Sequence, residues 1–557
     1  MMKTLTSRSM LLLAAAALVL ALLAGCSGGD NASGTNDGAA SGDSDGNTGA
    51  AGNGEAADVE YPAQITYWTT IVDHIKGSVT SLNEVSLYQE LERITGTKVD
   101  FKHPSGEGEQ VTEQLNLMIA SQNLPDVVET NWLTIPRGPE NAIQEGTILR
   151  LNELIEQHAP NFRKYLDEHP EVEKMIKTDE GSIYGFPFIR GDEQLMVFNG
   201  PIIRKDWLEA VGKEMPTTID EWEDVLTAFR DDDPNGNGQQ DEIPFFVKYD
   251  GNVKSPGLNN FIGSFGIAAQ FYQVDGKVQY GEIQPEFKEF LTVLSRWYEE
   301  GLLDPDFAAT DGSLKDAKVT GNQLGAFYGY AGSGIGRYTG LMEKDYPEAE
   351  LYPTPYASLE KGKVAPLGQR DSAYSGGYTA AITGKAKNPE QIVKWLDFAY
   401  SEEGHMLFNF GKEGVSYEMI DGYPTYTETI MNNPDGLNVS QAMSMHFRSA
   451  YGGPFIQDKR YIEQYMQMDA QKEAVKIWSE PENKIQMPPV TMTAEENQQF
   501  ASIMTDLNTY SDEMVTKFIM GVEPLTSFDQ YVETLKGMGI EQAIQIQQAA
   551  LDRYNQR

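Results

Sequence analysis

A chain of 557 residues has room for more than one folded lobe, because single hydrophobic cores stop growing near about 250–300 residues. Its apolar content of 40%, with 27 Tyr, 23 Phe and 7 Trp, is typical of a packed globular protein. The formal charge of −40 argues against nucleic-acid binding, since that function needs clustered Lys and Arg to neutralise phosphates.

Residues 1–25 are predicted to be a secretory signal peptide. Lys3 and Arg8 precede an apolar run from Met10 to Ala24, which is short for a membrane span. The run leads into "LAGC", which resembles a bacterial lipobox and places Cys26, the single cysteine of the chain, at the cleavage point. We expect Cys26 to carry a lipid; an ordinary signal peptide with an incidental cysteine is the alternative.

Residues 26–60 are predicted to form a flexible tether. Between Ser27 and Asp58 the sequence is mainly Gly, Ser, Ala, Asn and Asp, with six acids and no basic residue. Such a composition cannot bury enough apolar area to fold. We therefore expect the folded body to be held at a distance from the membrane.

A strand–helix–strand–helix–strand order is predicted between residues 65 and 130. Alternation in 65–71 indicates a strand, and Leu87, Leu91 and Ile94 have helical spacing before Gly96, which we expect to end that helix. The segments 98–101, 110–122 and 125–130 then read as strand, helix and strand. This order predicts a parallel sheet with helices on its faces, and ligands lie beyond the carboxyl ends of such strands.

The rest of the chain is predicted to be mostly helical. A helix over 216–229 opens with a capping box formed by Thr218 and Glu221. The last helix, over 540–554, has an apolar stripe from Ile540 to Tyr554. No repeat of solenoid type is present.

Several stretches, taken in order, carry a family resemblance. After the lipobox and tether come "YGFP" (184–187), "IRKDWLEAVG" (203–212), "PTTIDEW" (216–222), "DPNGNGQQDEIPF" (233–245), "KNPEQIVKWLDFAYSEEG" (387–404) and "GIEQAIQIQQAALDRY" (539–554). Together they resemble family 1 extracellular solute-binding proteins of Gram-positive type. Within that family the resemblance is to the large calcium-containing group related to alginate- and oligosaccharide-binding receptors of ABC importers.

The resemblance implies an α/β, periplasmic-binding-protein-like fold with two lobes, a ligand cleft between them and a helix-rich second lobe. The chain would cross between lobes near Phe186–Arg190 and again near Gly376–Ile382. The first lobe would hold residues 61–188 and about 378–430, and the second lobe about 189–377 and 431–557.

The acid-rich loop after residue 232 is predicted to bind Ca²⁺. Its oxygen-bearing residues follow the spacing of the first nine positions of an EF-hand loop, and glycine stands at position 6. Pro244 replaces the usual glutamate at position 12, and the resemblance implies that Glu242 takes that role. The alternative is a solvated turn whose Asn-Gly pairs supply positive φ. The predicted ligands are Asp233, Asn235, Asn237, Gln239, Asp241 and Glu242.

A sugar site needs aromatic faces and fixed polar groups. Helical periodicity assigns four tryptophans to the core, namely Trp207, Trp222, Trp297 and Trp395, and leaves Trp478 undecided. Trp68 and Trp132 lie at or just beyond predicted strands, so we expect them to contact the ligand, although packing under a loop is the alternative. The other candidate ligand contacts are Tyr249, Phe261, Tyr328, Tyr330, Arg190 and Arg370; for Arg370, an ion pair with Asp371 is the alternative.

No catalytic motif supports an enzyme. The two G-x-S-x-G matches fall in the anchor and the tether, the histidines are isolated, and no pair of carboxylates is singled out for glycoside hydrolysis. We therefore expect a lipid-anchored receptor on the outer face of the cell membrane that passes a carbohydrate, an oligosaccharide in particular, to an ABC permease. The alternatives are a surface sensing or adhesion protein and a secreted glycoside-active enzyme.

Overall fold

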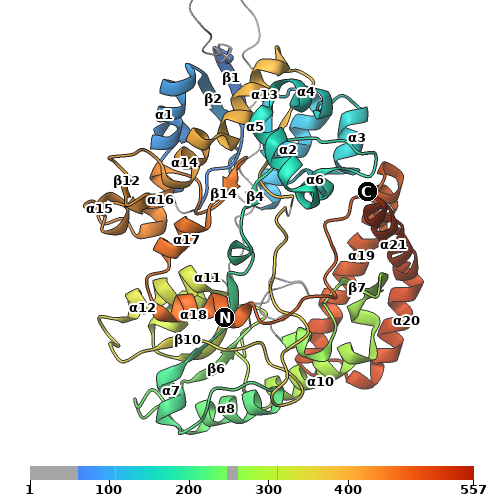
Figure 1. Cartoon of the computed structure of the whole chain (residues 1–557). Coiled ribbons are helices and arrows are strands. Elements are labelled where there is room, and N and C mark those ends of the chain that lie inside the picture. Colours follow the sequence, from blue (N-terminus) through green and yellow to red (C-terminus); the bar gives the residue numbers. More distant parts are fainter. Residues whose placement is uncertain (1–59, 74, 107, 248–260, 310–311, 375) are drawn as a thin grey trace, which may run out of the picture. The chain divides into compact units, whose positions relative to one another are not determined.

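The computed structural model describes residues 60–557 except 74, 107, 248–260, 310–311 and 375. The predicted signal peptide, Cys26, the tether and Tyr249 lie outside the described residues. Two four-stranded sheets organise the described part, with elements around the first sheet in the upper half of Figure 1 and elements around the second in the lower half. No helix in the described ranges is both long and apolar enough to cross a bilayer.

The first sheet confirms the predicted strand–helix order. Its strands, in the order β11-β3-β1-β2, are Thr379–Ile382, Val127–Thr130, Gln64–Trp68 and Lys98–Lys102. β1 pairs in parallel with β2 and β3, and β11 pairs antiparallel to β3. The crossover helices are α1 (Ser86–Thr95) and α2 (Glu109–Ser121). Gly96 ends α1 as expected, with a φ of 71° that favours glycine.

Further helices cover the first sheet and lie beside it (Figure 1). They are α3 Gly138–Gln144, α4 Asn152–His158, α5 Pro160–Glu168, α6 Pro170–Ile176, α13 Pro389–Asp397 and α14 Glu402–Phe410. A smaller group follows α14 and consists of β12 Tyr417–Ile420, β13 Tyr423–Tyr426, α15 Glu428–Met431, α16 Val439–His446 and α17 Lys459–Tyr465.

The second sheet is mixed. Its strands, in the order β10-β5-β9-β6, are Leu351–Pro353, Asn199–Arg204, Leu324–Tyr330 and Ile243–Phe246. β5 is antiparallel to β9 and β10, whereas β6 is parallel to β9. Its helices are α7 Lys205–Ala210, α8 Ile219–Asp231, α10 Pro285–Glu299, α11 Gly312–Thr320, α12 Arg337–Met342 and α18 Asp469–Trp478.

The predicted cap of α8 is present in a modified form. Thr218 accepts a hydrogen bond from the backbone N–H of Glu221 at 3.2 Å, as expected. The Glu221 carboxylate, however, accepts from the backbone N–H and hydroxyl of Thr217 at 2.9 and 2.7 Å. In a capping box the Glu221 carboxylate would accept from the backbone N–H of Thr218. Here it accepts from the N–H of the preceding residue instead.

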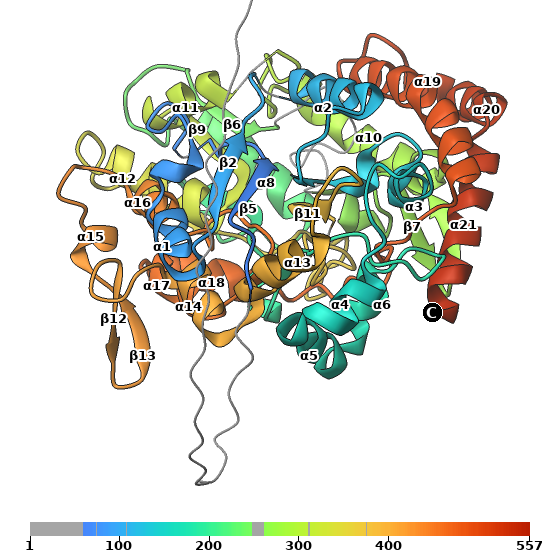
Figure 2. The same cartoon turned by 90° about the horizontal axis from the view of Figure 1, so that it is seen from above.

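Three long helices end the chain: α19 Ala494–Ile519, α20 Phe528–Met538 and α21 Ile540–Gln556. Their buried residues join the core of the second sheet, and the hairpin of β7 (Phe271–Val274) and β8 (Lys277–Tyr280) packs against α21. Both views place these helices on the flank opposite the β12–β13 hairpin (Figures 1 and 2). Of the predicted apolar stripe of the last helix, Ile540, Leu551 and Tyr554 are buried, at 0%, 3% and 7% exposure, whereas Ile544 is half-buried.

The two predicted crossing segments lie side by side. Phe186 and Ala380 exchange both backbone hydrogen bonds at 2.9 Å, so the outgoing and returning segments form an antiparallel bridge. A third passage runs through β14 (Ile456–Gln457) parallel to β4 (Ile189–Arg190). This passage comes later in the chain than the boundary expected near residue 430.

Candidate functional site

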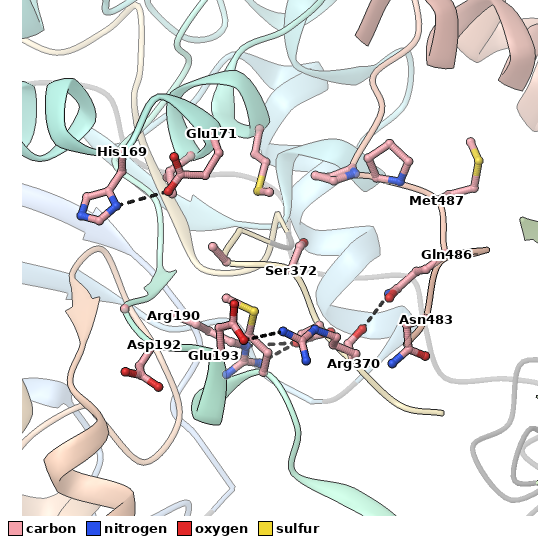
Figure 3. A pocket seen from close by; sticks show the side chains of 18 of the residues that line it. His169, Glu171, Arg190, Asp192, Glu193, Arg370, Ser372, Asn483, Gln486 and Met487 are labelled. Carbon is pink, nitrogen blue, oxygen red and sulfur yellow. Dashed lines mark hydrogen bonds and ion pairs between the residues drawn. The ribbon is translucent and has the colours of Figure 1, made fainter. Parts of the chain in front are cut away.

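A cavity of about 550 Å³ opens beside the crossing segments (Figure 3). Its walls come from α5 and α6, from the chain that follows β4, from residues 370–373 and from residues 482–489. The charged side chains of the lining are Arg190, Arg370, Glu171, Asp192, Glu193, Asp371 and Glu482. Segments far apart in the sequence therefore build one site next to the crossing points.

A second cavity of about 370 Å³ adjoins the first one. The two share Arg370, Asp371, Gln486 and Met487, which form a common wall. The rest of the second cavity carries uncharged polar groups and aromatic rings, among them Asn199, Gln270, Tyr272, Tyr328 and Gln369. Each volume lies in the range of about 300–1,000 Å³ that is usual for small-molecule sites.

Arg190 is held by an acid and by two neighbouring aromatic rings. Its Nη2 and Nε donate to Asp371 Oδ2 at 2.7 and 3.1 Å. The guanidinium carbon lies 4.9 Å from the centre of the Phe198 ring and 5.5 Å from that of Phe188. The planar guanidinium suits both the ion pair and the stacking.

Arg370, the second predicted arginine, lies on the wall between the cavities. Its Nη2 is 3.2 Å from Glu193 Oε2, and its backbone carbonyl accepts a hydrogen bond from Gln486 Nε2 at 2.6 Å (Figure 3). Sequence reasoning missed Gln486 because it lies 116 residues further along the chain. No local pattern could have brought it to this wall.

Tyr328 reaches the second cavity from β9. Its hydroxyl donates to Asn199 Oδ1 on the neighbouring strand β5, and burial together with the nearby Tyr356 raises the pKa of Tyr328 well above its usual value. The phenol is therefore neutral and can orient the Asn199 amide toward a ligand.

Tyr330 ends β9 with its ring 52% exposed. The ring stacks on Phe198 at 5.9 Å with an interplanar angle of 4°. Phe188, the second ring beside Arg190, contacts Tyr378 edge-on at 6.4 Å. Tyr378 is 37% exposed and has a φ of 52°, unusual for a tyrosine. Its position could not be read from the sequence, since no motif predicts a tyrosine in left-handed conformation.

The expectation that Trp132 and Trp68 face a ligand is wrong in this structure. Trp132 is 0% exposed because it begins a short turn, Trp132–Thr134, that folds the indole back so that its N–H donates to the carbonyl of Val128 at 3.2 Å. Trp68 is 6% exposed, since β1 lies between β2 and β3 and is covered on both faces.

Phe261 is also a core residue rather than a ligand contact. It is 1% exposed, and its ring centre lies 5.1–5.3 Å from those of Trp297, Phe245 and Trp222. The four tryptophans assigned to the core are buried as predicted, and the undecided Trp478 is buried too.

The acid-rich loop joins α8 to β6. Asp233 accepts from the backbone N–H groups of Asn237 and Gly238 at 3.1 and 3.0 Å. Asp241 accepts from the side-chain amides of Asn235 and Asn237 at 3.3 and 2.9 Å. The loop is thus closed on itself by its own predicted ligands. No three His, Cys, Asp or Glu side chains meet as a metal group anywhere in the described residues.

The donor chemistry of this loop nevertheless fits a hard cation. Glu242 Oε1 is buried and has no hydrogen-bond partner among the described residues. Burial, followed by the charges of Asp241 and Asp233, raises the pKa of Glu242. A cation bound by the carboxylate and amide oxygens would remove both penalties, and such all-oxygen sets suit Ca²⁺.

Comparison with known proteins gives the family. A model of the bacterial extracellular solute-binding protein family matches residues 81–406, more than half of the chain. The fructooligosaccharide ABC transporter substrate-binding protein FusA of Streptococcus pneumoniae is 29% identical over 494 residues, covering 85% of this chain and 87% of that protein. Lipoprotein LipO of Bacillus subtilis is 24% identical over 467 residues, covering 81% and 85%.

Solved structures agree with the fold class. FusA in complex with kestose superimposes with a TM-score of 0.72 at 26% identity, covering 88% of this chain and 99% of that one. The alginate-binding protein AlgQ2, solved without calcium ion, gives 0.72 at 26% identity, covering 88% and 98%. An EF-hand mutant of FusA with fructo-nystose gives 0.70 at 25% identity, covering 88% and 99%.

The expected periplasmic-binding-protein-like fold is therefore confirmed. The expectation of no enzymatic activity agrees with the family, whose members in these comparisons are substrate-binding proteins. The two mixed sheets, and the polar cavities beside the segments that link them, agree with the matched family model. The chain belongs to the bacterial extracellular solute-binding protein family.

Proposed function

We propose that this protein binds an oligosaccharide outside the cell and delivers it to the permease of an ABC importer. The observation that carries the proposal is the pair of adjoining cavities, which share one wall and whose linings offer amides, hydroxyls and aromatic rings. Sugar rings need both kinds of contact, with polar groups for the hydroxyls and ring faces for the C–H side. The similarity to FusA over most of both chains supports the same ligand class.

Within this site we assign roles to four of the predicted residues. Arg190, Arg370 and Tyr328 line the cavities, and Arg190 also holds Asp371 of the shared wall. Tyr330 lines neither cavity, but it is exposed and stacks on Phe198, the ring next to Arg190, so we assign it a contact at the rim. Binding would draw the two sheet regions together around the sugar, and the permease would recognise that closed form.

We also propose that the protein is anchored to the membrane through a lipid on Cys26, with residues 26–60 as a spacer. The "LAGC" sequence and the similarity to a lipoprotein of Bacillus subtilis support this. The anchor would keep the receptor near its permease.

We further propose a structural Ca²⁺ in the loop from Asp233 to Glu242. Asp233, Asn235, Asn237, Asp241 and Glu242 would hold it through side-chain oxygens, and Gln239 through its carbonyl. The ion would offset the negative charge of the three carboxylates that the loop carries, Asp233, Asp241 and Glu242. The calcium and EF-hand descriptions of AlgQ2 and FusA support this.

The sugar proposal is tested by calorimetry and thermal shift on the purified chain with calcium present. The panel consists of fructo-, malto-, xylo-, galacto- and uronate oligosaccharides. Saturable binding of at least one oligosaccharide, recovered uncleaved, is expected. Failure of the whole panel, with a folded protein, would refute the proposal.

A further inference from the structure

Two arginines in a cavity could bind an anionic sugar. Whether they do depends on the carboxylates that already lie beside them. The lining holds five carboxylates (Glu171, Asp192, Glu193, Asp371, Glu482) against two guanidinium groups, a balance of −3 with His169 neutral. The second cavity adds no charged side chain beyond the shared Arg370 and Asp371.

Arg190 has little capacity left for an anionic ligand. Two of its N–H groups already donate to Asp371, and rings of Phe188 and Phe198 lie over its guanidinium. Its side chain is only 18% exposed. A sugar carboxylate at the remaining N–H groups would lie close to the negative charge of Asp371, and displacing Asp371 would leave a partly buried acid without its counter-charge.

Arg370 is also paired, with Glu193 as the acid. The Glu193 side chain is 83% exposed, so this pair is weak and screened by solvent. Glu193 nevertheless puts a negative charge next to Arg370 within the lining of the first cavity (Figure 3). Removing the Glu193 carboxylate, and so leaving Arg370 unpaired, should therefore change the selectivity between neutral and anionic sugars most.

Lysines near the cavity do not make the net charge of its lining positive. Lys459 pairs with Asp192 at 3.1 Å and Lys484 with Glu482 at 2.6 Å, and neither lysine is part of the lining. Each lining cation in the described residues thus has an acid partner, while the amides of Asn199, Gln369 and Gln486 supply uncharged donors and acceptors. Bringing a further carboxylate to such a wall is repulsive at short range.

We infer that the site selects neutral oligosaccharides and discriminates against uronate oligosaccharides such as fragments of alginate or pectin. This inference rests on the proposed oligosaccharide function and narrows its substrate class. It separates this chain in ligand charge from the alginate-binding protein whose fold it shares.

The test compares oligogalacturonates with the same oligomers after reduction of their carboxyl groups, beside the neutral panel, by calorimetry on the full chain. The neutral form is expected to bind at least tenfold more tightly at low salt, with a smaller gap at high salt because ions screen the repulsion. Equal or tighter binding of the uronate form would overturn the inference while leaving the oligosaccharide function intact. If no oligosaccharide of either charge binds, the proposed function itself fails, and the inference with it.

Two variants test whether the preference for neutral sugars comes from the cavity wall. Glu193→Gln removes the acid that faces Arg370 and is expected to shift the ratio of neutral to uronate affinity at least fivefold toward the uronate. Glu513→Gln, which removes an exposed acid of α19 paired with Lys517, is the matched control and should leave that ratio unchanged. An equal shift in both variants would mean that overall charge, and not the cavity wall, sets the selectivity, and would overturn the inference.

Discussion

Two buried glutamates differ in their partners: one is paired with an arginine and the other only with hydroxyl groups. For each, we expect a different effect of substitution on stability. Glu129 on β3 faces Arg448, which donates to both of its oxygens at 2.5 and 3.0 Å, and Tyr67 donates to it as well. The side chains of the pair are 0% and 2% exposed. Glu282, in contrast, has hydroxyl partners only.

Glu129→Gln should lower the free energy of unfolding by about 3–5 kcal/mol, because it leaves Arg448 charged and buried without its counter-ion. Urea denaturation measures this loss. Asp100→Asn is the control: it removes one member of a surface pair with Lys102 whose side chains are 42% and 54% exposed, and should change stability by less than about 1 kcal/mol. A similar small change for both variants would contradict the assigned role.

Glu282→Gln should change how stability depends on pH. Burial raises the pKa of Glu282 from 4.5 to about 7, although three hydroxyls donate to it. The folded state therefore holds the proton more tightly than the unfolded chain. The stability that this proton contributes is present below about pH 4.5 and is lost as pH rises toward 7, a loss of about 3 kcal/mol in all.

Urea midpoints measured from pH 5 to 8 test this dependence. The wild-type protein should lose stability over that range relative to Glu282→Gln, in which the amide can donate to the Tyr280 hydroxyl. Parallel curves for the two proteins would show that the carboxyl group does not titrate in this range.

At the scale of elements, the loop between α8 and β6 is the most informative connection. Its Asn235 amide donates to the carbonyl of Asn322 at 3.2 Å, and Gln323 donates to Asp241 at 3.2 Å. The loop is therefore fastened to the start of β9, the strand that carries Tyr328 and Tyr330.

Removal of Ca²⁺ by a chelator should lower the melting temperature, and Asp233→Ala with Asp241→Ala should make the protein insensitive to the chelator. If the ion is present at a thousand times its Kd, it stabilises the fold by about 4 kcal/mol. Asp231→Ala, at the end of α8 and paired with Arg230, is the control and should keep its response to the chelator. Identical melting with and without chelator in the wild-type protein would contradict the calcium assignment.

Prediction from the sequence succeeded where local periodicity sets the structure. The strands and helices from β1 to β3 follow from alternation and helical spacing, and Gly96 ends α1 for a conformational reason that is local. It failed for Trp132, because the turn after β3 folds the indole back on its own strand. The cavity wall could be predicted only in part: Arg370 was found, but Gln486 reaches it through tertiary folding alone.

At the scale of the whole molecule, the end of α21 is tied to the turn after α6. Asp179 accepts from Arg553 at 2.5 Å, from Thr491 at 3.0 Å and from Arg557. Arg557 also donates to the carbonyl of Lys177 at 2.5 Å. The core of α19–α21 belongs to the second sheet, whereas Val172 and Ile176 of α6 belong to the core of the first.

Asp179→Asn should loosen this connection, because two arginines lose their shared charge and charge-assisted hydrogen bonds contribute about 1.5–3 kcal/mol each. Hydrogen exchange should show faster exchange in the last turns of α21 and in residues 177–181, with α20 protected as before. Asp552→Asn, on the exposed side of α21, is the control. Equal exchange in Asp179→Asn and the wild-type protein would mean that apolar packing alone holds α21 in place.

The anchor makes a prediction for the molecule in its cell. Cys26→Ala should release the protein from the membrane fraction or stop its maturation, since no other thiol is available for lipidation. Labelling with a fatty-acid analogue measures this. Equal labelling of the variant would refute the anchor.

The position of β11 also sets the order in which the chain can fold. β11 pairs Ile382 with Val127, so the first sheet lacks an edge strand until the entire second sheet has been synthesised and exported. Contacts so distant in sequence form slowly, and a sheet with an open edge is prone to wrong pairing. The β3 side of the sheet in residues 64–130 can therefore be completed only after residues 379–382 have followed.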